Sequence, residues 1–195
     1  MINDTELVLT PGAGGVLVNA LVLVQQGAIT RQDSQLARVR LAAVVADSGT
    51  VGARVGTTTL AAGNGSPSLG DYLLLPAGAS TVVVSVNGQA VSASSFTLLP
   101  GQDYTLMVHG PLAAAQLSWV RDDNRLPADV SRAKLRLING LSDTAAPLAM
   151  TLDFASVASA VAAGTASVYA SVAPTSGGAG SKNRSCPGGR TMHDF

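Results

Sequence analysis

The sequence predicts an all-β protein: an antiparallel sandwich of the immunoglobulin-like or transthyretin-like kind, in two tandem units of which the second is incomplete. Three observations support this fold class. Short segments that alternate apolar and polar residues recur about every 8–15 residues, with Gly, Pro and Asn between them. Glu and Lys, which cover most helix surfaces, are nearly absent, since Glu6, Lys134 and Lys182 are the only ones. A segment near residue 37 recurs near residue 133.

The composition excludes several classes of partner and site. Twelve Lys and Arg balance twelve Asp and Glu, so no basic surface is expected and nucleic acid is not a predicted partner. A hydrophobic fraction of 47% argues against disorder of the whole chain. Cys186 is the only cysteine, which excludes an intrachain disulfide and a zinc site of the multi-cysteine kind.

Residues 1–35 are predicted to be an N-terminal hairpin or the end of a preceding unit. Their apolar run, Val16–Val24, is far shorter than the roughly 20 residues that cross a bilayer as a helix, so no transmembrane segment is expected. Asp4 and Glu6 precede the run, whereas a signal peptide begins with basic residues. We therefore expect a strand here, in an exported protein whose signal peptide is not present in this chain.

The first sandwich unit is predicted over residues 36–127. Its opening segment, Arg38-Val39-Arg40-Leu41, alternates so that Val39 and Leu41 share one face. Asn87-Gly88 predicts a tight hairpin turn, because both residues accept positive φ. Further strands are expected at residues 81–86, 89–94 with a continuation to 99, 104–110 and 116–120.

A partial second unit is predicted over residues 128–176. Its expected strands are residues 134–138, 148–154 and 167–172. Phe154–Ala163 is a candidate for one or two helical turns instead, because it is rich in alanine and ends before Gly164. Residues 177–195 show no alternation and many glycines, so they are expected to form a disordered tail.

An internal repeat underlies this division. Residues 37–41 (ARVRL) match residues 133–137 (AKLRL) at an offset of 96, and Tyr72 matches Tyr169 at an offset of 97. At that offset, the later strands of the first unit have no recognisable counterpart before the end of the chain. The incomplete unit is expected to leave an unpaired strand edge, through which the chain could form a homo-oligomer.

The order of these segments resembles a bacterial family known as domain of unknown function 4397. The resemblance covers about residues 37–175 and is specific in the order of its motifs rather than in any one of them. Those motifs, as they stand here, are residues 37–41 (ARVRL), 72–78 (YLLLPAG), 82–88 (VVVSVNG), 98–110 (LLPGQDYTLMVHG), 122–127 (DDNRLP) and 133–139 (AKLRLIN). The resemblance implies an exported or cell-surface β-sandwich module, often in tandem. It implies no established activity, ligand or catalytic residue.

Chemistry-bearing residues are few, and no catalytic residue or cofactor is predicted. Asp122, Asp123 and Asn124 are the best candidates for a cation, because calcium prefers several oxygen ligands on a tight turn. Arg121 and Arg125 flank this loop and would compete for the carboxylates. His109 is expected to face solvent near the end of its strand, with a role as catalytic base as the alternative. His193 lies in the expected tail.

Three aromatic residues are predicted to be structural. Trp119 is expected in the core rather than on a stacking surface. Tyr72 and Tyr169 occupy the same place in the repeat, so each ring is expected to pack inward and each hydroxyl to bond to backbone. The glycine-rich segments at residues 12–15 and 63–65 lack the residues of phosphate-binding loops and are interpreted as flexible turns.

These observations predict a non-enzymatic, extracytoplasmic module with a structural, cell-surface or adhesion-type role. Its partner would be a protein or a glycan, recognised through loops or sheet edges. The alternative is a small-ligand or calcium-binding module, or an enzyme, that uses the Asp122–Asp123 loop. A pocket lined by Asp122, Asp123 or His109 would favour that alternative.

Overall fold

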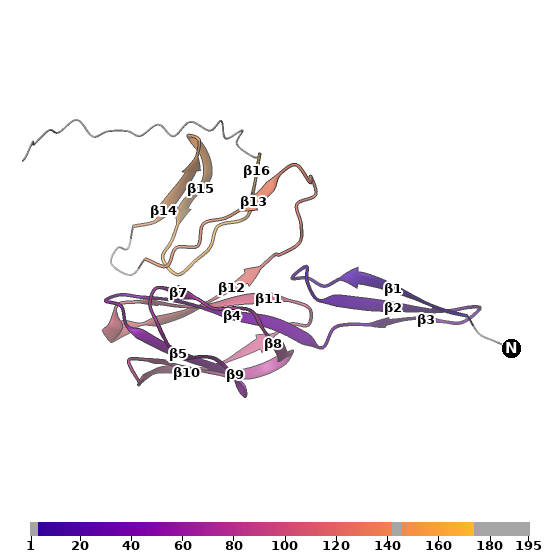
Figure 1. Ribbon diagram of the computed structural model, residues 1–195, viewed down its shortest axis with the longest axis horizontal. Coiled ribbons are helices and arrows are strands. Elements are labelled where there is room, and N and C mark those ends of the chain that lie inside the picture. Colours follow the sequence, from indigo (N-terminus) through magenta and orange to yellow (C-terminus); the bar gives the residue numbers. More distant parts are fainter. Residues whose placement is uncertain (1–3, 142–145, 174–195) are drawn as a thin grey trace, which may run out of the picture.

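The structure, a computed structural model, describes residues 4–141 and 146–173 (Figure 1). Within these ranges the regular elements are strands and one short 3₁₀ helix, η1 (Leu112–Ala114), so the all-β fold class is confirmed. None of the helices in the described part of the chain is long and apolar enough to span a membrane. The expected disordered tail, with Cys186 and His193, lies outside the described residues.

The centre of the molecule is a sandwich built by strands β4 to β12 (Figure 1). Its first sheet has the order β12-β11-β4-β7, and β8 also pairs with β4. Its strands are β4 (Leu36–Val45), β7 (Ser68–Leu69), β8 (Leu73–Pro76), β11 (Asp103–Gly110) and β12 (Gln116–Asp122). The β4–β11 pair is parallel, with Arg38 opposite Asp103, where the sequence led us to expect antiparallel pairing throughout. The alternation of apolar and polar residues predicts which face of the sheet each side chain occupies. It does not predict whether a partner strand distant in sequence runs parallel or antiparallel.

The second sheet of the sandwich has the order β10-β9-β5-β6. Its strands are β5 (Thr50–Val55), β6 (Thr58–Gly65), β9 (Gly78–Val86) and β10 (Gln89–Leu98). The β9–β10 hairpin closes at Asn87 and Gly88, whose φ angles are 50° and 76°, which confirms the predicted turn. Strands β5 and β6 contain Gly and Ala, which weaken the alternation that would have revealed them.

The core lies between the two sheets. Val39 and Leu41 of β4 meet Val82 and Val84 of β9 there, and all four side chains are buried. At one end of the core, the ring of Trp119 stacks on Phe96 with 4.1 Å between centroids, and both pack edge-to-face against Tyr104. Trp119 is therefore a structural residue at the border of the core, as predicted.

A separate three-stranded sheet, which we call the arm, precedes the sandwich. It consists of β1 (Thr5–Pro11), β2 (Val18–Val24) and β3 (Ile29–Gln32) in the order β1-β2-β3. The arm projects from one end of the sandwich as a single layer (Figure 1). Residues 18–24 of the apolar run thus form a strand, as expected, at the centre of this sheet.

Four further strands, together with the described segments that connect them, form what we call the second strand group. Strand β13 (Ala133–Leu135) pairs with β16 (Ala170–Val172), and β14 (Leu148–Leu152) pairs with β15 (Ala155–Val161). The helix considered for Phe154–Ala163 is wrong, because these residues contain β15. Asp153 and Phe154 form a tight turn with positive φ, and cross-strand pairing with β14 outweighs the modest helix preference of alanine.

The second strand group repeats the pairing register of the sandwich. Strands β13 and β16 correspond to β4 and β8, and the β14–β15 hairpin corresponds to β5–β6. The matched pairs, sandwich first, are Ala37–Leu75 and Ala133–Val172, Val55–Thr58 and Leu152–Ala155, Ala53–Ala61 and Met150–Ala158, and Ala42–Leu69 and Ile138–Ala166. The offsets are the 96 and 97 of the sequence repeat. The unit boundaries at residues 127 and 176 stay a prediction.

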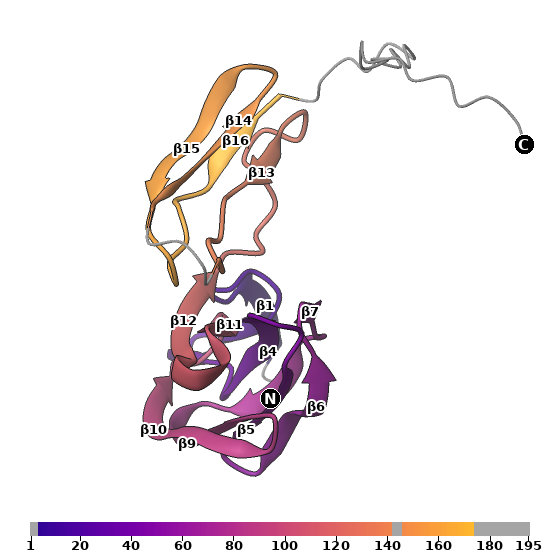
Figure 2. The same ribbon diagram turned by 90° about the vertical axis from the view of Figure 1, so that its left-hand side faces the viewer.

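The second strand group stands on the outer face of the first sheet and contacts it through the segments that connect its strands (Figure 2). Every residue of β11 is buried, both those that face the core and those that face outward. A Cβ atom built on Gly140 would lie 2.7 Å from Val44, and one built on Gly164 would lie 2.6 Å from His109. The backbone of the second strand group thus rests directly on β4 and β11. The expectation that His109 faces solvent is wrong for this reason.

Candidate functional site

The charged residues singled out in the sequence meet between the sandwich and the second strand group, at a place we call the junction. Arg38 and Arg40 alternate on β4 and project from its outer face, and Lys134 and Arg136 occupy the equivalent positions in the repeat. The acidic side comes from the start of β11 and the end of β12, where Asp103 and Asp122 lie opposite each other. Asp123, Asn124, Tyr72 and Tyr169 complete the junction.

Asp103 is held by a two-pronged ion pair with Arg38. The Arg38 Nε atom donates to Oδ1 at 2.9 Å and Nη2 donates to Oδ2 at 2.6 Å. Asn124 Nδ2 donates to the same Oδ2 at 2.6 Å. The Asp103 side chain is fully buried, and its hydrogen bonds raise the pKa of the Arg38 guanidinium above its usual value. The guanidinium of Arg38 therefore stays protonated at neutral pH.

Asp122 joins the sandwich to the second strand group. Its Oδ2 atom accepts hydrogen bonds from the Tyr72 hydroxyl and from Thr105 Oγ1, both at 2.6 Å. Its Oδ1 atom accepts from Nη2 of Arg136. Asp122 is 1% exposed. Burial is the main cause that raises the pKa of the Tyr72 hydroxyl, which remains a donor to Asp122 at neutral pH.

The two tyrosines each carry a pair of cations, and the arrangement is repeated. The Cζ atoms of Arg38 and Arg40 lie 4.5 and 4.6 Å from the centroid of the Tyr72 ring. Lys134 Nζ and Arg136 Cζ lie 4.7 and 4.5 Å from the centroid of the Tyr169 ring. The hydroxyl of Tyr72 was expected to bond to backbone, but it donates to the Asp122 carboxylate instead. Tyr169 does meet backbone, since its hydroxyl accepts from the Asp123 N–H at 3.4 Å.

Asp123 completes the junction on the side of the second strand group. Arg125 Nε lies 2.8 Å from its Oδ1 atom, and Lys134 Nζ lies 2.9 Å from its Oδ2 atom. These partners, Arg125 first, hold the pKa of the Asp123 carboxyl well below its usual value. Lys134 Nζ also donates to the backbone oxygens of Asp123 and Arg125. The loop is thereby tied to β13.

The comparisons with known proteins identify this architecture. The family model of a domain of unknown function, DUF4397, matches residues 37–147, from the start of β4 through the junction to the loop before β14. The chain belongs to the DUF4397 family. The predicted resemblance is therefore confirmed over those residues.

Searches of curated proteins and of solved structures gave the following results. No curated protein matches the chain. Among solved structures, a crystal structure from Bacteroides uniformis, described as a candidate cell adhesion protein, is similar at 9% sequence identity and a TM-score of 0.30. The match covers 60% of this chain and 66% of that chain.

The DUF4397 junction does not bring the three calcium candidates around one point. Asp122 turns toward Tyr72 and Arg136, Asp123 toward Arg125 and Lys134, and Asn124 toward Asp103. The carboxylate oxygens that calcium would need already accept from N–H and O–H donors, and cationic groups surround them. Among residues 4–141 and 146–173, no three His, Cys, Asp or Glu side chains are grouped to hold a metal. Sequence reasoning missed Arg136 and Tyr72 as the partners, although the repeat contains both.

His109 lies on the outward face of β11, away from the charged residues of the junction. Its Nε2 atom is 2.9 Å from Ser118 Oγ, a partner that no sequence motif indicates. Gly164 of the second strand group packs against the ring, because a Cβ atom built on it would lie 2.7 Å from this nitrogen. Burial lowers the pKa of the imidazole. The residue packs between the two parts of the DUF4397 chain as a neutral side chain.

Proposed function

We propose that the chain is a non-enzymatic module that is exported and acts at the cell surface, in a structural or adhesion-type role. The observation that carries this proposal is the arm, a single sheet whose apolar side chains are exposed on both faces. The junction supports it in a second way, because the acids that a catalytic or calcium site would use instead join the sandwich to the second strand group. The competing function at the Asp122–Asp123 loop has less support for the same reason.

The sequence of the arm is that of a buried sheet. Its central strand reads VNALVLV, a nearly continuous apolar run of the kind found in strands covered on both faces. Leu7 is 62% exposed, Leu9 is 61% exposed and Ile29 is 67% exposed. Monomeric proteins rarely leave apolar patches of this kind in water, and such patches mark interaction surfaces. A partner that pairs with the arm would bury part of this apolar surface.

The open edge of β1 favours a second copy of this chain as that partner. Gly12 N–H donates to Leu17 O, and Gln25 N–H donates to Asp4 O, at opposite ends of the β1–β2 pair. Bonded residues alternate along an antiparallel pair. The backbone groups of Thr5, Leu7 and Leu9 therefore point away from β2, where they are free to pair with another strand.

The β1 edge of one chain is also complementary to the β1 edge of a second copy. When two β1 strands run antiparallel about Val8, Leu7 faces Leu9 of the second copy and Glu6 faces Thr10, so no like charges meet. Pro11, which has no N–H, falls at the end of the pairing. We therefore propose that two arms join edge to edge into one sheet of six strands. The sequence pointed to an unpaired edge in the second unit for such contacts, and the arm offers a better-defined one.

Light scattering coupled to size exclusion tests the association. The full chain should show twice its 19.5 kDa at micromolar concentration. The double variant Leu7→Lys/Leu9→Lys should show the monomer mass, because lysine on an edge strand blocks pairing. Leu74→Lys, at another exposed leucine, should remain dimeric. A wild-type chain that is monomeric at all concentrations would overturn the proposed partner, and an unrelated protein or glycan would then be the occupant to seek.

Labelling of intact producing cells tests the location. Antibodies against the chain should stain unpermeabilised cells, and external protease should remove the staining. A cytosolic marker should remain protected in the same cells. If the chain stays with that marker, the extracytoplasmic role is wrong.

A further inference from the structure

A groove lies between the sandwich and the second strand group, separate from the arm. Its floor is the outer face of the first sheet, with Ala42 and Val44 from β4 and Met107 from β11, and its sides include Leu69 and Ile138. The cavity has a volume of about 410 Å³, and its lining is mostly apolar. Ligand sites in proteins have this size, this apolar character and this place between packed units.

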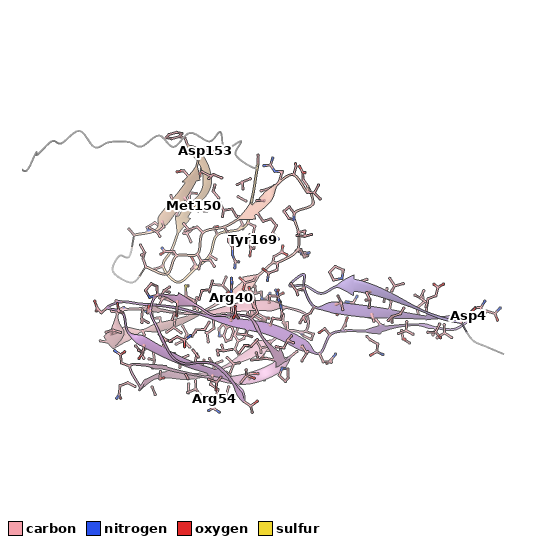
Figure 3. The ribbon with its side chains drawn as sticks, viewed as in Figure 1. Asp4, Arg40, Arg54, Met150, Asp153 and Tyr169 are labelled. Atoms are coloured by element: carbon pink, nitrogen blue, oxygen red, sulfur yellow. The ribbon has the colours of Figure 1, made fainter. Side chains whose placement is uncertain are left out.

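Arg40 is the one charged residue that lines the groove. It projects from β4 on the face of the sandwich turned toward the second strand group, which carries Tyr169 (Figure 3). Its side chain is 24% exposed. Its Nε atom donates to Thr105 Oγ1 at 2.9 Å, which fixes the plane of the guanidinium. Tyr72 lies against the same group.

The terminal nitrogens of Arg40 have no acceptor among the described protein groups. The other three cations of the junction all donate from their outermost nitrogens: Arg38 to Asp103, Lys134 to Asp123 and Arg136 to Asp122. Within the described residues, the Nη atoms of Arg40 donate to no protein group, and its nearest carboxylate oxygen is 4.0 Å from Nε. A half-buried guanidinium with free donors, beside an apolar groove, is suited to an anionic acceptor.

We propose that the groove binds a small amphipathic carboxylate. The apolar chain of the ligand lies over Ala42, Val44 and Met107, and its carboxylate accepts two hydrogen bonds from the Nη atoms of Arg40. The fork of an arginine matches a carboxylate in this way. The Asp122 carboxylate next to Arg40 disfavours a doubly charged group such as a phosphate, because like charges repel. The site does not depend on pairing of the arms, so the two proposals can fail separately.

Calorimetric titration of the full chain with three probes tests the site. Octanoate should bind saturably with one site per chain. Acetate, which lacks the apolar chain, and 1-octanol, which lacks the charge, should each bind at least about tenfold more weakly. If 1-octanol binds as tightly as octanoate, the role of Arg40 is overturned. If octanoate shows no saturable binding, the site itself is overturned.

Two variants and a control locate the binding. Arg40→Gln should weaken octanoate by about tenfold or more, because it removes the charged donors. Leu69→Asp should abolish binding, because it places a carboxylate on an exposed wall of the groove, where folding tolerates the change. Leu74→Asp, on an exposed leucine outside the groove, should bind as the wild type does. Unchanged affinity in Leu69→Asp would overturn the proposal even if Arg40→Gln failed to fold.

Discussion

Asp122 shows how one side chain can serve two parts of a chain. Its two oxygens face in different directions, toward Tyr72 and Thr105 of the sandwich and toward Arg136 beyond it. A buried carboxylate without partners would be costly, so each donor around Asp122 offsets part of its lost hydration. The result is a fixed geometry at the point where the chain leaves β12. Exposed ion pairs, such as Arg31 with Asp33, contribute little by comparison.

Asp122→Asn is expected to destabilise the protein by about 3 kcal/mol, because it leaves the guanidinium of Arg136 without its counter-ion. Urea unfolding followed by circular dichroism measures the change. Asp129→Asn, at an exposed loop carboxylate whose hydrogen bonds go to Ser131, should leave the midpoint nearly unchanged. Equal midpoints for the two variants would show that the junction adds no stability.

At the scale of elements, the repeat shows the same hairpin built from two different sequences. Strands β5 and β6 pair in the same register as β14 and β15. Both hairpins also have a register shift at the same place, between Ala53 and Arg54 in one and between Met150 and Thr151 in the other. Gly63 in β6 has a φ of 150°, and Ala160 occupies the matching position of β15 with a φ of 52°. Alanine disfavours such a backbone because its Cβ atom crowds the carbonyl oxygen. The second hairpin therefore carries local strain that glycine would relieve.

Ala160→Gly is expected to stabilise the protein by roughly 0.5–1 kcal/mol, since relief of the left-handed strain exceeds the added chain entropy of glycine. The shift in thermal midpoint of the full chain reports it. The matched control is Ser159→Gly, at the adjacent exposed residue of β15, whose φ is negative. That change should destabilise, because it only loosens a strand. A loss of stability in Ala160→Gly as large as that in Ser159→Gly would contradict this reading of the hairpin.

At the scale of the molecule, β11 lies between the core of the sandwich and the second strand group. One of its faces packs in the core of the sandwich, and the other lies under the second strand group. Asp103 and His109 are the titratable residues on this face of β11; Asp103 is paired with Arg38, whereas Ser118 and Gly164, which contact His109, are uncharged. Protonation of the imidazole would place a charge where none of the described residues supplies a counter-ion. Docking of the second strand group therefore favours neutral His109.

Acid is expected to loosen this docking. The folded-state pKa of His109 is lowered, so below about pH 6.5 the unfolded state binds the proton while the folded state does not. The free energy of unfolding should fall as the pH drops from about 7 toward the folded-state pKa. Urea midpoints between pH 7.5 and 5 test this, and the fall should be smaller in His109→Gln. Loss of the Asp123 pair belongs to a more acidic range, because its pKa is lowered from 3.8. Parallel curves for wild type and His109→Gln would contradict the expectation.

The local features of this protein can be predicted from its amino-acid sequence. Alternating Val and Leu specified the strands and their inner faces, Asn87-Gly88 specified a turn, and the repeat placed equivalent cations and tyrosines 96 and 97 residues apart. These features depend on neighbours along the chain, such as the φ preferences of two turn residues or the period of a strand. The fold class and the family followed from them.

Contacts between groups that are distant along the chain are visible only in the folded protein. Nothing near β4 in sequence indicates that β11 runs parallel to it, and nothing near His109 indicates that Gly164 will cover it. The strand at Ala155–Val161 forms because β14 offers a partner, which outweighs the helix preference of alanine. Asp122 was recognised as a candidate, yet its role was decided by Arg136 and Tyr72, which folding brings beside it. The physical reason is that hydrogen bonding and burial depend on contacts in space, whereas a sequence pattern reports only on residues that are close along the chain.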